Sequence, residues 1–68
     1  MENEIVMKVE GLRQKQAKEK ILRRIEALPG IEYAGVDAIA GTITVIGGDV
    51  DRLGLEDEIE GMGYPLVR

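Results

Sequence analysis

Residues 17–30, with the sequence AKEKILRRIEALPG, contain a helix and the signal that ends it. The apolar residues recur at spacings of four, four and three, namely Ala17, Ile21, Ile25 and Leu28. This period predicts one stripe of an α-helix that starts near Gln14, with Leu22 beside the stripe and charged side chains around the rest. Pro29 and Gly30 then predict the end of the helix, because proline removes a backbone donor and glycine accepts left-handed angles.

Alternating apolar residues on both sides of this helix predict strands. Upstream, Ile5, Met7 and Val9 share one parity and so one face of a strand. Downstream, residues 31–37 alternate imperfectly, which predicts a strand with a bulge or bend. After a short turn at 38–41, the β-branched run TITVI at 42–46 is the clearest strand of the chain.

A second helix and a short last strand complete the pattern. The apolar stripe of this helix consists of Leu55, Ile59 and Met62. Asp49 or Asp51 is expected to cap its start, and Gly61 and Gly63 predict its end. The sequence PLV at 65–67 predicts a brief final strand, whose proline suits the edge of a sheet.

The order of elements is therefore βαββαβ, in two halves that each contain strand, helix and strand. Right-handed crossovers favour the α+β ferredoxin-like sandwich, a four-stranded antiparallel sheet with two helices on one face and the first and third strands at its centre. We expect a single domain over residues 1–68 with one thin aliphatic core, because a chain this short buries only about 60% of its unfolded surface. The expected core consists of Met7, Val9, Ile21, Ile25, Leu28, Ile43, Val45, Leu55 and Ile59.

Composition and charge exclude several classes of function. No apolar run approaches the roughly 20 residues that cross a bilayer, and the start lacks the basic flank of a signal peptide, so no membrane insertion and a cytoplasmic location are expected. Residues 13–26 hold six basic and two acidic side chains, and residues 49–60 hold one basic and six acidic ones. The net charge of −4 and the absence of Phe and Trp argue against nucleic acid as a partner. The two segments are therefore interpreted as solvated helix faces of opposite charge.

Six short segments occur in the order and spacing of a known family. They are Val9-Glu10-Gly11, Ala27-Leu28-Pro29-Gly30-Ile31, Val36-Asp37, Gly41-Thr42-Ile43-Thr44-Val45, Asp49-Val50-Asp51 and the run from Glu60 to Tyr64. Over nearly its whole length the chain thereby resembles the heavy-metal-associated (HMA) domain family. The members of that family carry copper, zinc or mercury, either alone as chaperones or as modules of metal-pumping ATPases.

The metal motif of that family, Met-x-Cys-x-x-Cys, is replaced in this chain. Positions 12–17 read LRQKQA, so leucine replaces the methionine, and Gln14 and Ala17 replace both cysteines. A glutamine amide is a neutral hard-oxygen donor and alanine offers no donor, so a soft ion has no reason to stay. Arg13 and Lys15 would each repel a metal ion by roughly 1 kcal/mol. We therefore expect no metal site here and no cofactor.

The other residues favour neither a replacement metal site nor catalysis. Met7 and Met62 fall on apolar stripes, where core packing is the commoner role, and Met1 is terminal. The carboxylates at 56–60 spread around a helix and predict at most weak contact with Ca²⁺ or Mg²⁺. The chain has no cysteine and no histidine, and its carboxylates, lysines, tyrosines and threonines are not grouped with a catalytic partner. We expect no enzyme.

The function that survives is binding through a surface: a protein-interaction or regulatory module without soft-metal binding. The candidate docking loop, which would face a partner with an acidic surface, consists of Leu12, Arg13, Lys15, Lys18 and Tyr64. The open face of the sheet offers a second surface, at Val6, Tyr33 and Ile46, through which weak self-association is a further hypothesis. The resemblance to HMA domains, in which an aromatic at this place packs beside the metal loop, also implies that Tyr64 is a lid on the end of the core near Leu12.

Two alternative functions remain open from the sequence. One is a metal-ion carrier that uses ligands other than cysteine, such as Met7, Met62 and carboxylates. The other is a regulatory domain that binds a small anion at the first turn of the first helix, beside Arg13 and Lys15.

Overall fold

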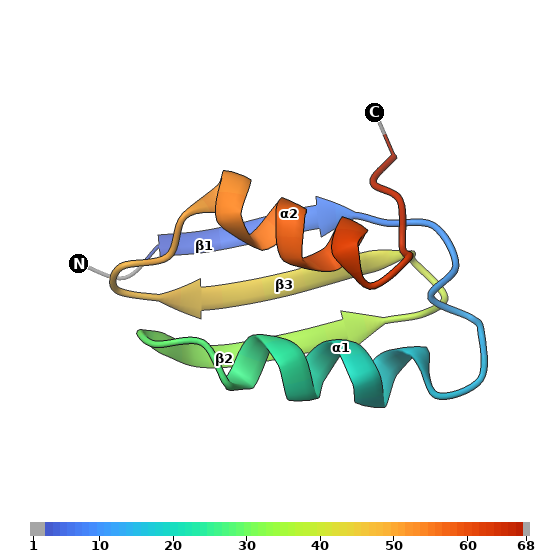
Figure 1. Cartoon of the computed structure of the whole chain (residues 1–68), viewed down its shortest axis with the longest axis horizontal. Helices are drawn as coiled ribbons and strands as arrows, with labels where there is room; N and C mark the ends of the chain where they lie inside the picture. The colour runs from blue at the N-terminus through green and yellow to red at the C-terminus, as the bar shows by residue number, and fades with distance from the viewer. Residues whose placement is uncertain (1–2, 68) are drawn as a thin grey trace.

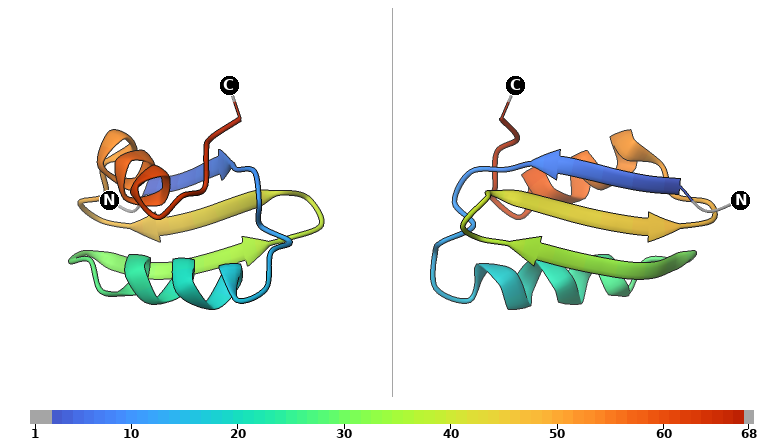
Figure 2. Two further views of the ribbon diagram at one scale, coloured as in Figure 1. Left: turned by 45° about the vertical axis from the view of Figure 1, so that its right-hand side comes forward. Right: turned by 180° about the vertical axis from the view of Figure 1, so that it is seen from behind.

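The computed structural model describes residues 3–67, which form two layers, a sheet and a pair of helices (Figure 1). The elements in chain order are β1 (Asn3–Lys8), α1 (Ala17–Glu26), β2 (Ile31–Asp37), β3 (Thr42–Gly47) and α2 (Arg52–Gly61). Seen from behind, the three strands lie in front of both helices, so the helices cover one face of the sheet and leave the other open (Figure 2). The predicted α+β class, with both helices on one face, is confirmed.

The sheet is antiparallel throughout and has the order β1-β3-β2. The β-branched strand β3 therefore pairs on both sides, and its Ile43 and Val45 are fully buried. The register of β2 against β3 shifts between Ile31 and Tyr33, which is the bulge that the imperfect alternation predicts.

The predicted fourth strand is not seen in residues 3–67, so the expectation of a four-stranded sheet is wrong by one strand. The segment after α2 makes an isolated antiparallel bridge, Val9 with Leu66. Two backbone hydrogen bonds flank the bridge, from the amide of Glu10 to the carbonyl of Pro65 at 2.9 Å and from the amide of Val67 to the carbonyl of Lys8 at 2.8 Å. Pro65 has no amide to donate, which limits the pairing of so short a segment. The outer side of β1 is consequently covered at its end rather than paired along its length.

The core lies between the sheet and the helices and is aliphatic, as predicted. Eight of the nine expected core residues are buried, and the buried set also includes Ile5, Leu12, Ala17, Tyr64 and Leu66. Leu28 is only half-buried and packs on the side of the core. It lies beyond the end of α1, where its amide donates to the carbonyl of Ile25 at 3.0 Å as the chain turns toward β2.

The two helices start differently. The Asp51 side chain caps α2 by accepting a hydrogen bond from the Gly54 amide at 3.1 Å, which settles the choice between the two predicted caps. By contrast, α1 begins at Ala17 rather than near Gln14, and the residue before it, Gln16, is left-handed and makes no side-chain cap. The basic residues at 13 and 15 therefore stand in a loop ahead of the helix.

Candidate functional site

The loop between β1 and α1 is built from successive tight turns. Gly11 and Gln16 take left-handed backbone angles, with φ of 84° and 67°. The backbone amide of Gln14 donates to the backbone carbonyl of Gly11, and the backbone amide of Ala17 donates to the backbone carbonyl of Gln14, both at 3.1 Å. Leu12 is buried and anchors the loop on the core, while residues 13–16 are all exposed. The loop is thus a fixed support for outward-pointing side chains.

The two positions that the sequence predicts to match the metal ligands of the HMA motif differ sharply in environment. Gln14 is exposed, whereas Ala17 is fully buried in the core. The Gln14 side chain folds back over Gly11, so that a Cβ at position 11 would lie 3.2 Å from its amide nitrogen. A buried methyl group and a folded-back amide provide no pair of converging donors for a metal ion.

Tyr64 closes the other side of this loop. Its side chain is 5% exposed and belongs to the same core cluster as Leu12. The ring lies against Gly11, because a Cβ added there would be 3.4 Å from its Cδ1 atom. The left-handed backbone angle at position 11, with φ of 84°, is what favours glycine there, and the Tyr64 ring and the Gln14 side chain pack next to it.

Three cations of the candidate docking loop, Arg13, Lys15 and Lys18, point into solvent. None of them makes an ion pair or a hydrogen bond through its side chain with residues 3–67. They line an open hollow of about 650 Å³, together with Leu12, Gln14, Gln16, Glu19 and Ala38. The structure brings the predicted cations onto one surface and leaves their charges available to a partner, while Tyr64 lies beneath this surface in the core.

The residues predicted for the open sheet face lie on that face but do not form one row. Tyr33 is opposite Ile46 in the β2–β3 register, and Val6 is opposite Thr44 in the β1–β3 register. Val6 is 47% exposed and Tyr33 is 54% exposed, whereas Ile46 is half-buried. The Tyr33 ring lies over Gly35, where any added side chain would meet it. The apolar patch on this face is therefore modest and flat.

The ligands considered for a cysteine-free metal site are separated by the fold. Met7 is buried in β1, while Met62 follows α2 and is half-buried at the surface between the helices. Within residues 3–67, no group of three or more Asp and Glu side chains is placed to hold a metal ion. Met1 lies outside the described residues.

Within residues 3–67, no helix has the length and apolar character needed to span a bilayer.

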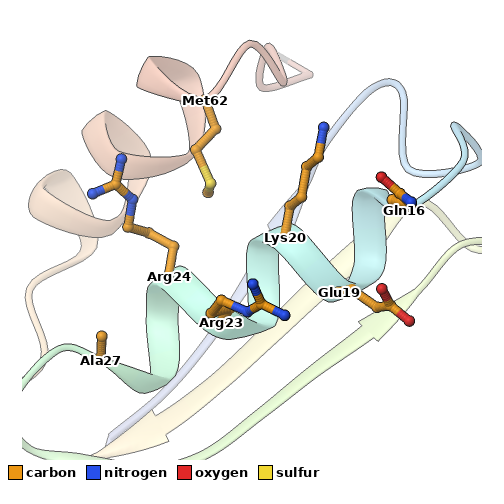
Figure 3. A pocket seen from close by; sticks show the side chains of 7 residues that line it. All are labelled: Gln16, Glu19, Lys20, Arg23, Arg24, Ala27 and Met62. Atoms are coloured by element: carbon orange, nitrogen blue, oxygen red, sulfur yellow. The ribbon is translucent and has the colours of Figure 1, made fainter.

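One surface feature was missed by sequence reasoning, a groove of about 530 Å³ between α1 and the end of α2. Figure 3 shows Met62 pointing into the space between Arg24 and Lys20, with Arg23 farther out on the same helix. Arg24 pairs with Glu58 of α2 at 3.4 Å. The sequence signal for this surface was the high density of basic residues at 13–26. The groove itself forms only because α2 packs beside α1.

Comparisons with solved structures agree on the architecture. The chain superimposes on a structure described as the CsoZ metallochaperone with a TM-score of 0.90 and 22% identity, covering all of both chains. The CopZ metallochaperone gives a TM-score of 0.88 at 25% identity, with 96% of this chain and all of that chain covered. The water-soluble region of the P-type ATPase CopA from Bacillus subtilis gives 0.87 at 26% identity, where 98% of this chain covers 46% of that one.

No family model matches the chain, and no curated protein matches it in sequence. The structural neighbours are nevertheless metallochaperones and related domains at high TM-scores, which confirms the resemblance to HMA domains. This chain therefore has the fold of the copper-chaperone-like HMA domains, in a form that contains no cysteine.

Proposed function

We propose that residues 1–68 act as one HMA-like domain that binds a partner protein, or regulates it, without carrying a soft metal ion. The observation that carries this proposal is the state of the two ligand positions: Ala17 is a buried methyl group and Gln14 is an amide folded over Gly11. Cu(I) and similar ions need thiolate or thioether donors that converge. The loop keeps its position on the fold, so what it can still offer a partner is shape and charge.

The property of the loop that a partner would recognise is its positive charge. In this proposal Arg13, Lys15 and Lys18, which make no ion pairs within residues 3–67, dock on an acidic surface of a protein in the cytoplasm. Electrostatic contacts of this kind set the rate and the specificity of encounter more than they set affinity. The flat open face, with Val6, Tyr33 and Ile46, is the second candidate surface, either for the partner or for weak self-association.

A charge-reversal comparison tests the docking loop. The variant Arg13→Glu/Lys15→Glu is compared with Lys20→Glu/Arg23→Glu, which makes the same change in net charge at exposed positions of α1. Binding is measured at low and at high salt to the protein that the unaltered chain recovers by pull-down. The loop variant is expected to lose most of its binding at low salt, and the control is expected to lose much less.

The result for Tyr33→Ala separates the two surfaces. This change removes the exposed ring from the open face and leaves the loop intact. If Tyr33→Ala abolishes binding while Arg13→Glu/Lys15→Glu does not, the docking surface is the sheet and the proposal for the loop is wrong.

The two alternative functions predict different ligands. A carrier using Met7, Met62 and carboxylates should bind Cu(I) or Zn²⁺ with one-to-one stoichiometry. A regulatory domain that recognises a small anion beside Arg13 and Lys15 should bind inorganic phosphate. Direct titration with each of these ligands distinguishes both alternatives from a module that binds protein alone.

A further inference from the structure

The two edges of the sheet are treated differently by the rest of the chain. On the outer side of β1, the Arg52 side chain of α2 donates to the carbonyl of Val6 at 3.0 Å. Farther along, the segment at 64–67 bridges Val9 and bonds to the carbonyl of Lys8. These contacts blunt the β1 edge against pairing with another strand.

The β2 edge has no comparable cover. Within the described part of the chain, residues 33–36 make hydrogen bonds only to β3. Residues 33–36 carry no charge and no proline, whereas the ends of the strand hold two features that discourage edge pairing, the acidic Glu32 and Asp37 and the bulge between Ile31 and Tyr33. The segment at 33–36 is therefore the part of this edge that can accept a strand.

Helix α1 lies beside this open edge and presents a self-complementary side. The groove and the Arg24–Glu58 pair mark the side of α1 that faces α2. By helical geometry the opposite side, toward the β2 edge, carries Lys18, Leu22 and Glu26 at intervals of four residues. Leu22 is half-buried between an exposed cation and an exposed anion.

We propose that a second copy of this chain docks on this side, with β2 antiparallel to the partner's β2 and α1 antiparallel to the partner's α1. In that arrangement Lys18 lies opposite the partner's Glu26, and Glu26 lies opposite the partner's Lys18. Leu22 meets the partner's Leu22 between the two ion pairs. The contact is isologous, so it closes as a dimer and leaves no free β2 edge.

The positions of Leu22 in α1 and of Ala34 in β2 are compatible with a single two-fold axis for the proposed dimer. Leu22 lies at the middle of α1 (Ala17–Glu26). Ala34 lies at the middle of β2 (Ile31–Asp37). The chain reverses direction between α1 and β2, so the two elements run antiparallel beside each other (Figure 1). One axis can therefore pass between both pairs of elements.

The β2 sequence also fits pairing with itself about Ala34. Tyr33 then lies opposite the partner's Gly35, on the open face of the joined sheet. Within each chain the Tyr33 ring already lies over Gly35, so both rings would lie on the same face of the joined strands.

Charge exchange tests this dimer with the chain alone, independently of any partner protein. Sedimentation equilibrium of the full chain is measured from micromolar to millimolar concentration. Each single reversal, Lys18→Glu or Glu26→Lys, changes two attractive pairs into two repulsive ones and is expected to weaken the dimer about tenfold at low salt. The double variant Lys18→Glu/Glu26→Lys restores opposite charges and should return the dissociation constant to that of the unaltered chain.

A matched control and a second readout complete the experiment. Lys20→Glu makes the same charge change on the side of α1 that faces the groove and should leave the dimer intact. Amide exchange at residues 33–36 should slow as concentration rises. A chain that stays monomeric at millimolar concentration overturns the proposal, as does a dimer that the single reversals leave unchanged or that the double variant fails to restore. Both reversals suit the helix dipole, so loss of α1 would not explain a weakened dimer.

Discussion

Ile25→Ala is the change that most directly probes the packing of α1 on the sheet. Ile25 is fully buried in the core between the helices and the sheet. The substitution removes three carbon atoms, worth about 2.4 kcal/mol of transfer free energy at ~0.8 kcal/mol each. The cavity left behind adds to this, so the expected loss is ~2–5 kcal/mol. For a chain of 68 residues the whole free energy of unfolding is about 3–10 kcal/mol, so much of it is at stake.

Urea denaturation followed by far-UV circular dichroism measures this loss. At an m-value of ~1 kcal/mol/M, typical of a small domain, the midpoint should fall by about 2 M or more. Lys20→Ala is the matched control, because Lys20 lies on the same helix with its side chain exposed, and it should cost less than ~0.5 kcal/mol. If Lys20→Ala costs more than Ile25→Ala, the helix does not present this face to the sheet and the reasoning is refuted.

Two further predictions concern the loop and the sheet. The double change Gln14→Cys/Ala17→Cys should create a thiol site for Cu(I), seen as competition with a Cu(I) chelator; a folded variant that fails to compete would show that these positions are not equivalent to the HMA ligands. Gly47→Ala should destabilise the domain by ~1–3 kcal/mol, because the new Cβ would overlap the carbonyl oxygen of Gly30. Gly61→Ala, where a Cβ has open space at the end of α2, is the control and should cost nothing in the same urea assay.

Much of the fold could be predicted because local signals and packing agree. The stripe at Ile21 and Ile25 and the run at 42–46 are each consistent with one element only. Ile21 and Ile25 are buried as expected, as are Ile43 and Val45 of the run. The prediction of a last strand at 65–67 was wrong, because this segment makes only an isolated bridge. Its apolar residues suit a strand, but Pro65 removes a donor and the pairing with Val9 stops at one bridge. Whether a segment pairs as a strand depends on how many backbone hydrogen bonds it can make in the fold. A local sequence pattern does not show this number.

The candidate site was only partly predictable for a related reason. The spacing from Val9 places the loop, and the exposure of Arg13 and Lys15 follows from their charge. The packing of Tyr64 beside this loop could be expected only from the resemblance to HMA domains, and the bond from Arg52 to Val6 joins residues far apart in the sequence. Such contacts arise from the packing of α2 and the segment after it, so no local pattern contains them.

The central proposal is that this domain binds no soft metal ion at the loop between β1 and α1. A competition titration of the unaltered chain against a Cu(I) chelator under anaerobic conditions tests it most directly. We predict no transfer of Cu(I) to the chain beyond the weak uptake of any acidic protein, because Gln14 and Ala17 provide no pair of soft donors. One-to-one binding of Cu(I) with submicromolar affinity would contradict the claim.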